Sequence, residues 1–180
     1  MSNNGTVPRD TPFTPSADEL LRNNLGYTEQ FADQGLAVEP RRRLAVVACM
    51  DSRMDIFEMF GLAHGDAHIM RNAGGVVTDD VVRSLVVSQR LLGTREIILV
   101  HHTDCGLQKI TEDGFKREIE IETGVKPWWA LEAFADPFED VRQSMARLRM
   151  SPFVMHKDHI RGFVYDVDNG GLVEVPPQAG

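Results

Sequence analysis

The chain has 180 residues, of which 42% are apolar, so it can form one domain with a sizeable core but not a second independent one. Its formal net charge of -8 argues against a nucleic-acid partner, because such proteins cluster Lys and Arg on one surface. The polar start of the sequence and the lack of an apolar stretch of about 18 residues predict a cytoplasmic protein without a membrane span.

The N-terminal segment, residues 1–15, contains three prolines and few apolar side chains. This composition predicts an extended arm that becomes ordered only by packing on another surface. A single α/β domain is expected over residues 16–180. Its first helix is predicted to begin at Ser16, because Ser16 and Glu19 form an S-x-x-E capping box, and to end before Gly35.

Strand and helix patterns then alternate along the first half of the chain. Residues 44–48 are continuously apolar, which is typical of a parallel strand that is covered on both faces. The elements expected after it are a helix at 55–60, a strand at 67–70, a glycine turn at 71–75, a helix at 78–92 and a strand at 96–101. This alternation predicts an α/β fold with a mostly parallel sheet flanked by helices.

The second half of the chain continues the pattern and then reverses direction. Its expected elements are a charged helix at 111–123, a short element from 127, a helix at 138–150, a strand at 160–167 and a final strand at 172–175. The sequence D-N-G-G at 168–171 predicts a tight turn between the last two strands. The final strand is therefore expected to lie antiparallel at one edge of the sheet.

Both cysteines of the chain follow predicted strands. Cys49 comes directly after the first strand, and Cys105 follows the third strand with His102 three residues before it. If these strands are neighbours, the three side chains meet at the carboxyl edge of the sheet. Two thiolates and one imidazole form a three-ligand zinc set, whereas structural zinc usually has four protein ligands. The alternative is that the cysteines are buried and pack as small apolar side chains.

Asp51 and Arg53 extend the first of these motifs. In an extended backbone both side chains would project to the same side as Cys49. The Asp51 carboxylate could be a fourth metal ligand or an acceptor for metal-bound water, and Arg53 can hold it off the metal through a bidentate ion pair. A simple ion pair that closes a loop is the alternative. His101 is expected to face away from the metal, since adjacent strand residues point to opposite faces.

The residues around the two motifs bear on the kind of site that they form. Thr103 and Asp104 are candidates for turn residues or for partners of the ligands. A phosphate-binding loop with Cys49 as the nucleophile would follow the pattern C-x5-R and so place arginine at position 55, which holds aspartate. The sequence therefore favours a metal site over a nucleophilic cysteine.

The two motifs together resemble those of the β-class carbonic anhydrases, and most closely the short prokaryotic branch of that family. Residues 49–53 read C-M-D-S-R, which matches C-x-D-x-R, and residues 102–106 read H-T-D-C-G, which contains H-x-x-C. The resemblance extends over residues 44–175. It implies Zn²⁺ bound by Cys49, His102 and Cys105, with Asp51 paired to Arg53. It also implies a sheet ordered 2-1-3-4 plus the antiparallel edge strand, and a homodimer or a higher homo-oligomer.

The activity that this resemblance implies is the reversible hydration of carbon dioxide to bicarbonate by zinc-bound hydroxide, the reaction of a zinc lyase. The dyad of Asp51 and Arg53 would orient the hydroxide. The motifs do not distinguish this activity from hydrolysis of carbon disulfide or carbonyl sulfide at the same zinc site. A non-catalytic zinc-binding regulatory module, in which Asp51 closes the site as a fourth ligand, is the remaining alternative.

Overall fold

A computed structural model describes residues 12–177 of the chain. The chain divides into two compact units, residues 1–36 and residues 37–180. Residues 1–11 of the arm that the sequence predicts lie outside the described residues, and the arm's boundary at residue 15 stays a prediction. Within the described part of the chain, no helix is long and apolar enough to cross a membrane.

The first unit contains helix α1, Ala17–Glu29. The helix begins next to Ser16 as predicted, but the Ser16 side chain makes no capping hydrogen bond, so the prediction of a capping box was wrong. The backbone of Ser16, with ψ near 1°, lacks the extended conformation that N-cap residues normally adopt. No residue of α1 is buried, and three leucines, Leu20, Leu21 and Leu25, are at least 60% exposed.

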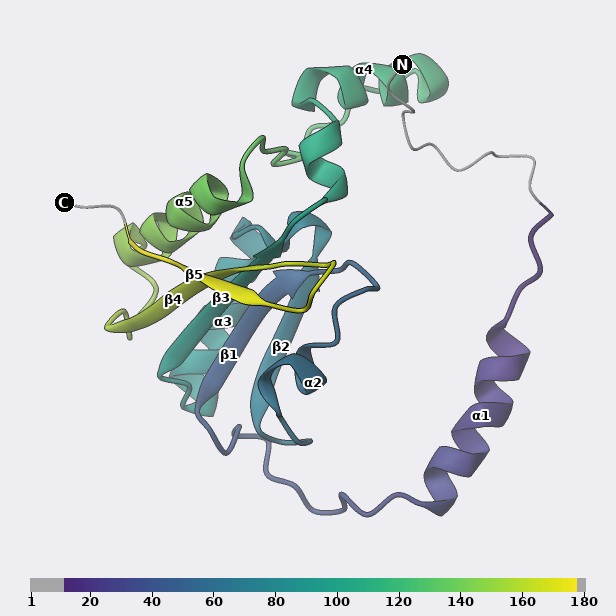
Figure 1. Ribbon diagram of the computed structural model, residues 1–180, viewed down its shortest axis with the longest axis vertical. Coiled ribbons are helices and arrows are strands. Elements are labelled where there is room, and N and C mark those ends of the chain that lie inside the picture. The colour runs from purple at the N-terminus through teal and green to yellow at the C-terminus, as the bar shows by residue number, and fades with distance from the viewer. Residues whose placement is uncertain (1–11, 178–180) are drawn as a thin grey trace. The chain divides into compact units, whose positions relative to one another are not determined.

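The second unit is built on a five-stranded sheet (Figure 1). Its strand order is β2-β1-β3-β4-β5, with parallel pairing except between β4 and β5, and this confirms the predicted fold class. The strands are β1 Leu44–Cys49, β2 Ala67–Asn72, β3 Glu96–His102, β4 His159–Tyr165 and β5 Leu172–Val175. The helices are α2 Ile56–Phe60, η1 Ala73–Gly75, α3 Asp79–Leu92, η2 Gly106–Lys109, α4 Glu112–Thr123 and α5 Pro137–Met150.

Both faces of the sheet are covered, which explains the continuously apolar sequence of β1. All six residues of β1 are buried. Ala45 and Val47 face a core that includes residues of α3 and α5, whereas Val46 and Ala48 face a second core that includes Ile56 of α2. Figure 1 shows α3 and α2 on opposite sides of the sheet. Cys49 and His102, two of the predicted metal ligands, are the last residues of β1 and β3 and lie at the carboxyl end of this doubly covered region.

The segment between α4 and α5 differs from the sequence prediction. The sequence predicts a short element from residue 127, but residues 124–136 contain no helix or strand. The segment is instead fastened by a distant side chain, because the Glu112 carboxylate accepts hydrogen bonds from the backbone N–H groups of Leu131 and Glu132 at 3.0 to 3.1 Å. A side-chain interaction across this many residues leaves no periodic signal in the sequence.

Gly162 marks the place where α5 packs most closely on β4. A Cβ atom at this position would overlap Cγ1 of Val141 and would lie 3.2 Å from Sδ of Met145. We expect Gly162→Ala to lower the free energy of unfolding by about 1 to 3 kcal/mol, because both helix residues are buried and have little room to move. Urea unfolding followed by circular dichroism measures the change.

The matched control for this substitution is Gly106→Ala. A Cβ atom at Gly106 meets nothing within 4 Å, and the residue does not have a positive φ. We therefore expect the urea midpoint of Gly106→Ala to stay close to that of the wild type. Equal midpoints for the wild type and Gly162→Ala would contradict the close packing of α5 on the sheet.

Candidate metal centre

The fold brings the three predicted ligands together at one edge of the sheet. β1 and β3 are adjacent parallel strands, so Cys49 at the end of β1 lies beside the end of β3, where His102 is the last residue. Cys105 follows three residues later. The ligand atoms of the three side chains all lie within 4.8 Å of one another, and all three residues are buried.

The hydrogen bonds of His102 prepare one ring nitrogen for a metal. Nδ1 lies 2.8 Å from the backbone oxygen of Thr103. Because a carbonyl oxygen only accepts hydrogen bonds, Nδ1 carries the proton and donates a hydrogen bond to this oxygen. The other nitrogen, Nε2, is buried and has no hydrogen-bond partner. Burying a ring nitrogen whose lone pair has no partner lowers stability. Because the proton is on Nδ1, the lone pair of Nε2 points into the group and could bind a metal ion.

The two thiols influence each other's ionisation. A hydrogen bond from Cys105 lowers the pKa of Cys49 to about 4. The same contact, together with burial, raises the pKa of Cys105. The pair therefore favours one thiolate and resists a second one, since two negative charges would lie side by side in a buried place. A divalent cation removes this conflict, because it stabilises both thiolates at once.

The donor set fits zinc in both chemistry and number. Soft thiolates and a neutral imidazole are the ligands that zinc prefers in proteins. The group contains three residues rather than four, which is the number typical of catalytic zinc with one position left for water or substrate. Both cysteines are free of disulfides and so are available as ligands.

Asp51 and Arg53 form a bidentate ion pair beside this group. Arg53 donates from Nε to Asp51 Oδ1 at 2.9 Å and from Nη2 to Oδ2 at 2.7 Å. The hydrogen bonds from Arg53 hold the pKa of Asp51 far below its usual range, so the carboxylate is ionised at neutral pH. Asp51 Oδ2 also lies 3.6 Å from Nε2 of His102. The carboxylate is thus beside the ligand group while its charge is shared with Arg53.

Arg71 is a residue of the site that the sequence did not single out. Its side chain donates from Nε to the backbone oxygen of Cys49 at 2.9 Å and from Nη2 to the backbone oxygen of Asp51 at 2.6 Å. It therefore fixes the turn that carries the first motif. The parallel register pairs Arg71 with Ala48, next to Cys49. A correct prediction of this register would have identified Arg71 as a residue of the site.

The predicted glycine turn lies directly against the end of β1. Gly75 has a φ of +72°, and a Cβ atom there would lie 2.7 Å from the backbone nitrogen of Cys49 and 2.9 Å from the backbone oxygen of Val100. Only glycine combines this left-handed backbone with so close an approach. The turn therefore lets β1 and β3 deliver their ligands without a side chain between them.

The segment from His102 to Cys105 is held from two directions. Thr103 Oγ1 accepts a hydrogen bond from the backbone N–H of Val167 at 3.1 Å, which ties the turn to the end of β4. Gln108 Oε1 accepts from the backbone N–H of Cys105 at 2.9 Å. Thr103 thus has the turn role that the sequence suggested, while Gln108 was not foreseen because its contact arises from the η2 turn.

His101 lies on the other face of the sheet from His102, as alternation in a strand predicts. It is fully buried, and its Nε2 lies 2.6 Å from Oδ2 of Asp140 in α5. The centroid of its ring also lies 5.3 Å from the centroid of the Phe134 ring. His101 therefore joins α5 to the sheet and does not contribute to the ligand group.

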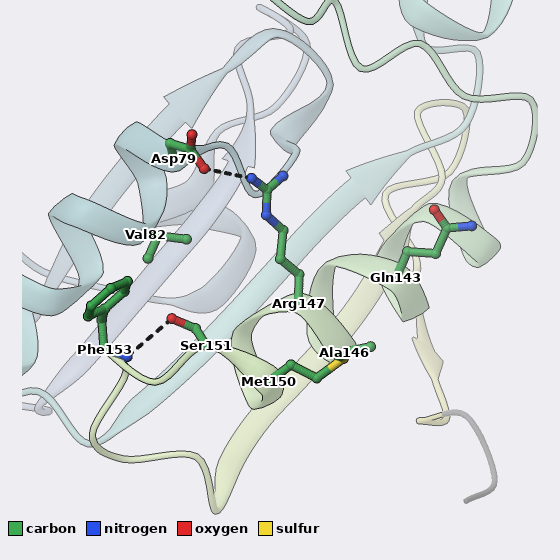
Figure 2. Close-up of a pocket in the computed structure, with 8 residues that line it drawn as sticks. All are labelled: Asp79, Val82, Gln143, Ala146, Arg147, Met150, Ser151 and Phe153. Atoms are coloured by element: carbon green, nitrogen blue, oxygen red, sulfur yellow. Dashed lines mark hydrogen bonds and ion pairs between the residues drawn. The ribbon is translucent and has the colours of Figure 1, made fainter.

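Hollows on the described part of the second unit include one between two helices and one beside the first motif. One, of about 550 Å³, lies between α3 and α5, where Arg147 pairs with Asp79 at 2.7 Å (Figure 2). It contains none of the predicted site residues. The other, of about 400 Å³, is lined by Ser52, Arg71 and residues of α2, next to the turn that carries Asp51. The chemistry of the ligand group, rather than cavity size, therefore identifies the site.

The fold and this centre define a class of protein, namely an α/β protein in which two cysteines and a histidine that could hold a metal ion lie beside an ionised carboxylate. The chain matches the family described as carbonic anhydrase over residues 44–135. It is 54% identical to beta-carbonic anhydrase 1 of Mycobacterium tuberculosis over 160 residues, which cover 89% of this chain and 98% of that protein. The chain belongs to the β-class carbonic anhydrase family, whose members are zinc enzymes.

Solved structures agree with this assignment. A carbonic anhydrase from Streptococcus mutans superposes with a TM-score of 0.86 at 42% identity, covering 92% of this chain and all of that one. A carbonic anhydrase from Glaciozyma antarctica gives a TM-score of 0.84 at 36% identity, covering 91% of this chain and all of that one. In the sequence comparison, a carbon disulfide hydrolase of an Acidianus strain is less similar to this chain than the mycobacterial protein is, with 36% identity over 86% of this chain and 88% of that protein.

Proposed function

We propose that this chain catalyses the reversible hydration of carbon dioxide to bicarbonate at zinc held by Cys49, His102 and Cys105. The observation that carries the proposal is the position of Asp51, which is paired with Arg53 and still lies 3.6 Å from Nε2 of His102. A carboxylate held in this way leaves a three-ligand centre open and stands ready to bind a water molecule there. The 54% identity to a β-carbonic anhydrase supports this reaction.

In the proposed mechanism, Asp51 and Arg53 orient the attacking water. Cys49, His102 and Cys105 would hold zinc, which would supply the Lewis acidity that makes water ionisable near neutral pH. The Asp51 carboxylate accepts a hydrogen bond from the attacking oxygen and so directs a lone pair towards the carbon of carbon dioxide. Arg53 keeps the carboxylate ionised and occupies the oxygens that would otherwise bind the metal.

The backbone around this centre supports the same roles. Arg71 holds the carbonyl groups of Cys49 and Asp51, so the ligand and the carboxylate keep a constant separation. Met50 is the residue between them in the sequence, and its backbone N–H donates to the backbone oxygen of Asn72 at 2.8 Å. The turn is therefore fixed before substrate arrives, which reduces the cost of orienting the water.

Initial rates with three substrates test the proposed reaction. We expect stopped-flow assays of the zinc-loaded protein to give rapid hydration of carbon dioxide and much slower release of sulfide from carbonyl sulfide and carbon disulfide. Release of sulfide from carbon disulfide without hydration of carbon dioxide would contradict the proposed substrate. No turnover of any of the three, despite about one zinc per chain, would favour a non-catalytic zinc-binding module.

The chain is further proposed to act as a homodimer or a higher homo-oligomer in the cytoplasm. The exposed leucines of α1 support self-association, because an apolar helix face without a covering surface is unfavourable in water. Free thiols at the metal site suit a reducing compartment. We expect light scattering to give a mass at least twice the 20.2 kDa of one chain, and a monomer at micromolar concentration would contradict this proposal.

A further inference from the structure

Asp104 accepts hydrogen bonds from the end of the Arg53 guanidinium that does not face Asp51. Arg53 donates from Nη1 to Asp104 Oδ2 at 3.0 Å and from Nη2 to the backbone oxygen of Asp104 at 3.2 Å. Its Nε and the remaining hydrogen of Nη2 serve Asp51. One guanidinium therefore joins the two motifs of the site, and its orientation towards Asp51 is set from behind by Asp104.

The backbone at Asp104 is unusual for a residue with a side chain. Its φ is +55°, in the left-handed region where glycine is favoured. This conformation turns both the carbonyl and the carboxylate of Asp104 towards Arg53. A glycine would adopt the turn more easily but would offer only the carbonyl. The presence of aspartate indicates that the carboxylate contributes something that the turn itself does not need.

Lys109 balances the additional negative charge. Its Nζ lies 2.6 Å from Oδ1 of Asp104, the oxygen that Arg53 does not use. Without it, two carboxylates would compete for one guanidinium. With it, Asp51, Asp104, Arg53 and Lys109 form a neutral set, so Asp104 can hold Arg53 without drawing it away from Asp51.

We propose that Asp104, balanced by Lys109, is a positioning residue for carbon dioxide hydration. It keeps the Arg53 guanidinium turned so that Nε and Nη2 face the Asp51 carboxylate. Asp104 does not touch the reacting atoms and acts only through Arg53. The inference rests on the proposed function, in which Asp51 orients the attacking water.

Substitution of Asp104 by glycine and by asparagine separates this role from that of the backbone. Both residues tolerate the left-handed conformation, but only asparagine retains a side-chain oxygen for Nη1. In zinc-loaded protein we expect Asp104→Gly to lower kcat about tenfold or more with KM little changed, and Asp104→Asn to recover most of the loss. Zinc content is expected to stay near one per chain in both variants.

A crystal structure of Asp104→Gly supplies a readout other than activity. We expect the Arg53 guanidinium to leave the position in which Nε and Nη2 both contact Asp51. The same substitution in an Arg53→Ala background is expected to change kcat less than about twofold, because the two residues act as one unit. Asp80→Asn, which removes an exposed carboxylate paired with Arg83, is the matched control and is expected to keep wild-type kcat.

Several outcomes would overturn the inference. Wild-type kcat in Asp104→Gly with an unchanged contact between Arg53 and Asp51 is one. An equal loss of kcat in the presence and absence of Arg53 is another, because Asp104 would then act independently of it. If the wild-type protein fails to hydrate carbon dioxide, the proposed function fails, whereas the crystal structure still tests the hold of Asp104 on Arg53.

Discussion

Asp51→Asn is expected to lower kcat for carbon dioxide hydration by about 10²- to 10³-fold while zinc content stays near one per chain. The amide offers one oxygen acceptor instead of two, so the bidentate pair with Arg53 is lost along with the negative charge. The attacking water then loses its orienting acceptor. KM is expected to change little, because Asp51 acts on the reacting water rather than on bound carbon dioxide.

The pH dependence of this variant offers a sharper check. Arg53 holds the pKa of Asp51 far below its usual range, so the wild-type carboxylate stays ionised from about pH 6 to about pH 9. The ratio of wild-type to variant kcat should therefore be constant over this range. Stopped-flow assays at several pH values measure it, with Asp80→Asn as the control, and undiminished turnover in Asp51→Asn would refute the role of this carboxylate.

Cys49→Ser is expected to lose the metal and with it all measurable activity. Serine is a poor zinc ligand at neutral pH, because its hydroxyl does not ionise as the thiol does. Removing a residue that only hydrogen-bonds to a metal ligand lowers metal affinity by about 10- to 100-fold. Cys49→Ser removes a ligand itself, so its loss of zinc affinity should be larger. Elemental analysis after dialysis against a weak chelator is expected to find well under one zinc per chain.

A neighbouring substitution controls for damage to the turn. Met50 is 65% exposed and precedes Asp51, so Met50→Leu should keep both zinc and turnover. The fold of Cys49→Ser is checked by its circular dichroism spectrum. Full zinc content in folded Cys49→Ser would exclude this thiol as a ligand and would move the metal to another set of residues.

The ligand group could be predicted because its signals are local. A buried parallel strand is recognisable by its continuous apolar sequence, and the residue that follows it must lie at the carboxyl edge of the sheet. Cys49 and the pair of His102 and Cys105 follow two such runs. The strand order then depended on the family resemblance, since apolar sequence alone does not say which strands are neighbours.

The supporting contacts could not be predicted in the same way. Arg71 reaches the first motif through the register of β2 with β1, and register is a property of paired strands. Asp104 was a candidate for a role near the ligands, but its contact with Arg53 depends on a left-handed turn within the second motif. The Ser16 capping box failed for the opposite reason, because a local pattern matched while the backbone did not adopt the required conformation.

A crystal structure of the zinc-loaded protein at about pH 8 tests the central claim most directly. The account predicts zinc on Cys49, His102 and Cys105, with the Asp51 carboxylate still paired to Nε and Nη2 of Arg53. The fourth coordination position of the zinc would then be open to water or substrate. An Asp51 oxygen at about 2.0 to 2.2 Å from zinc, with Arg53 released, would contradict it.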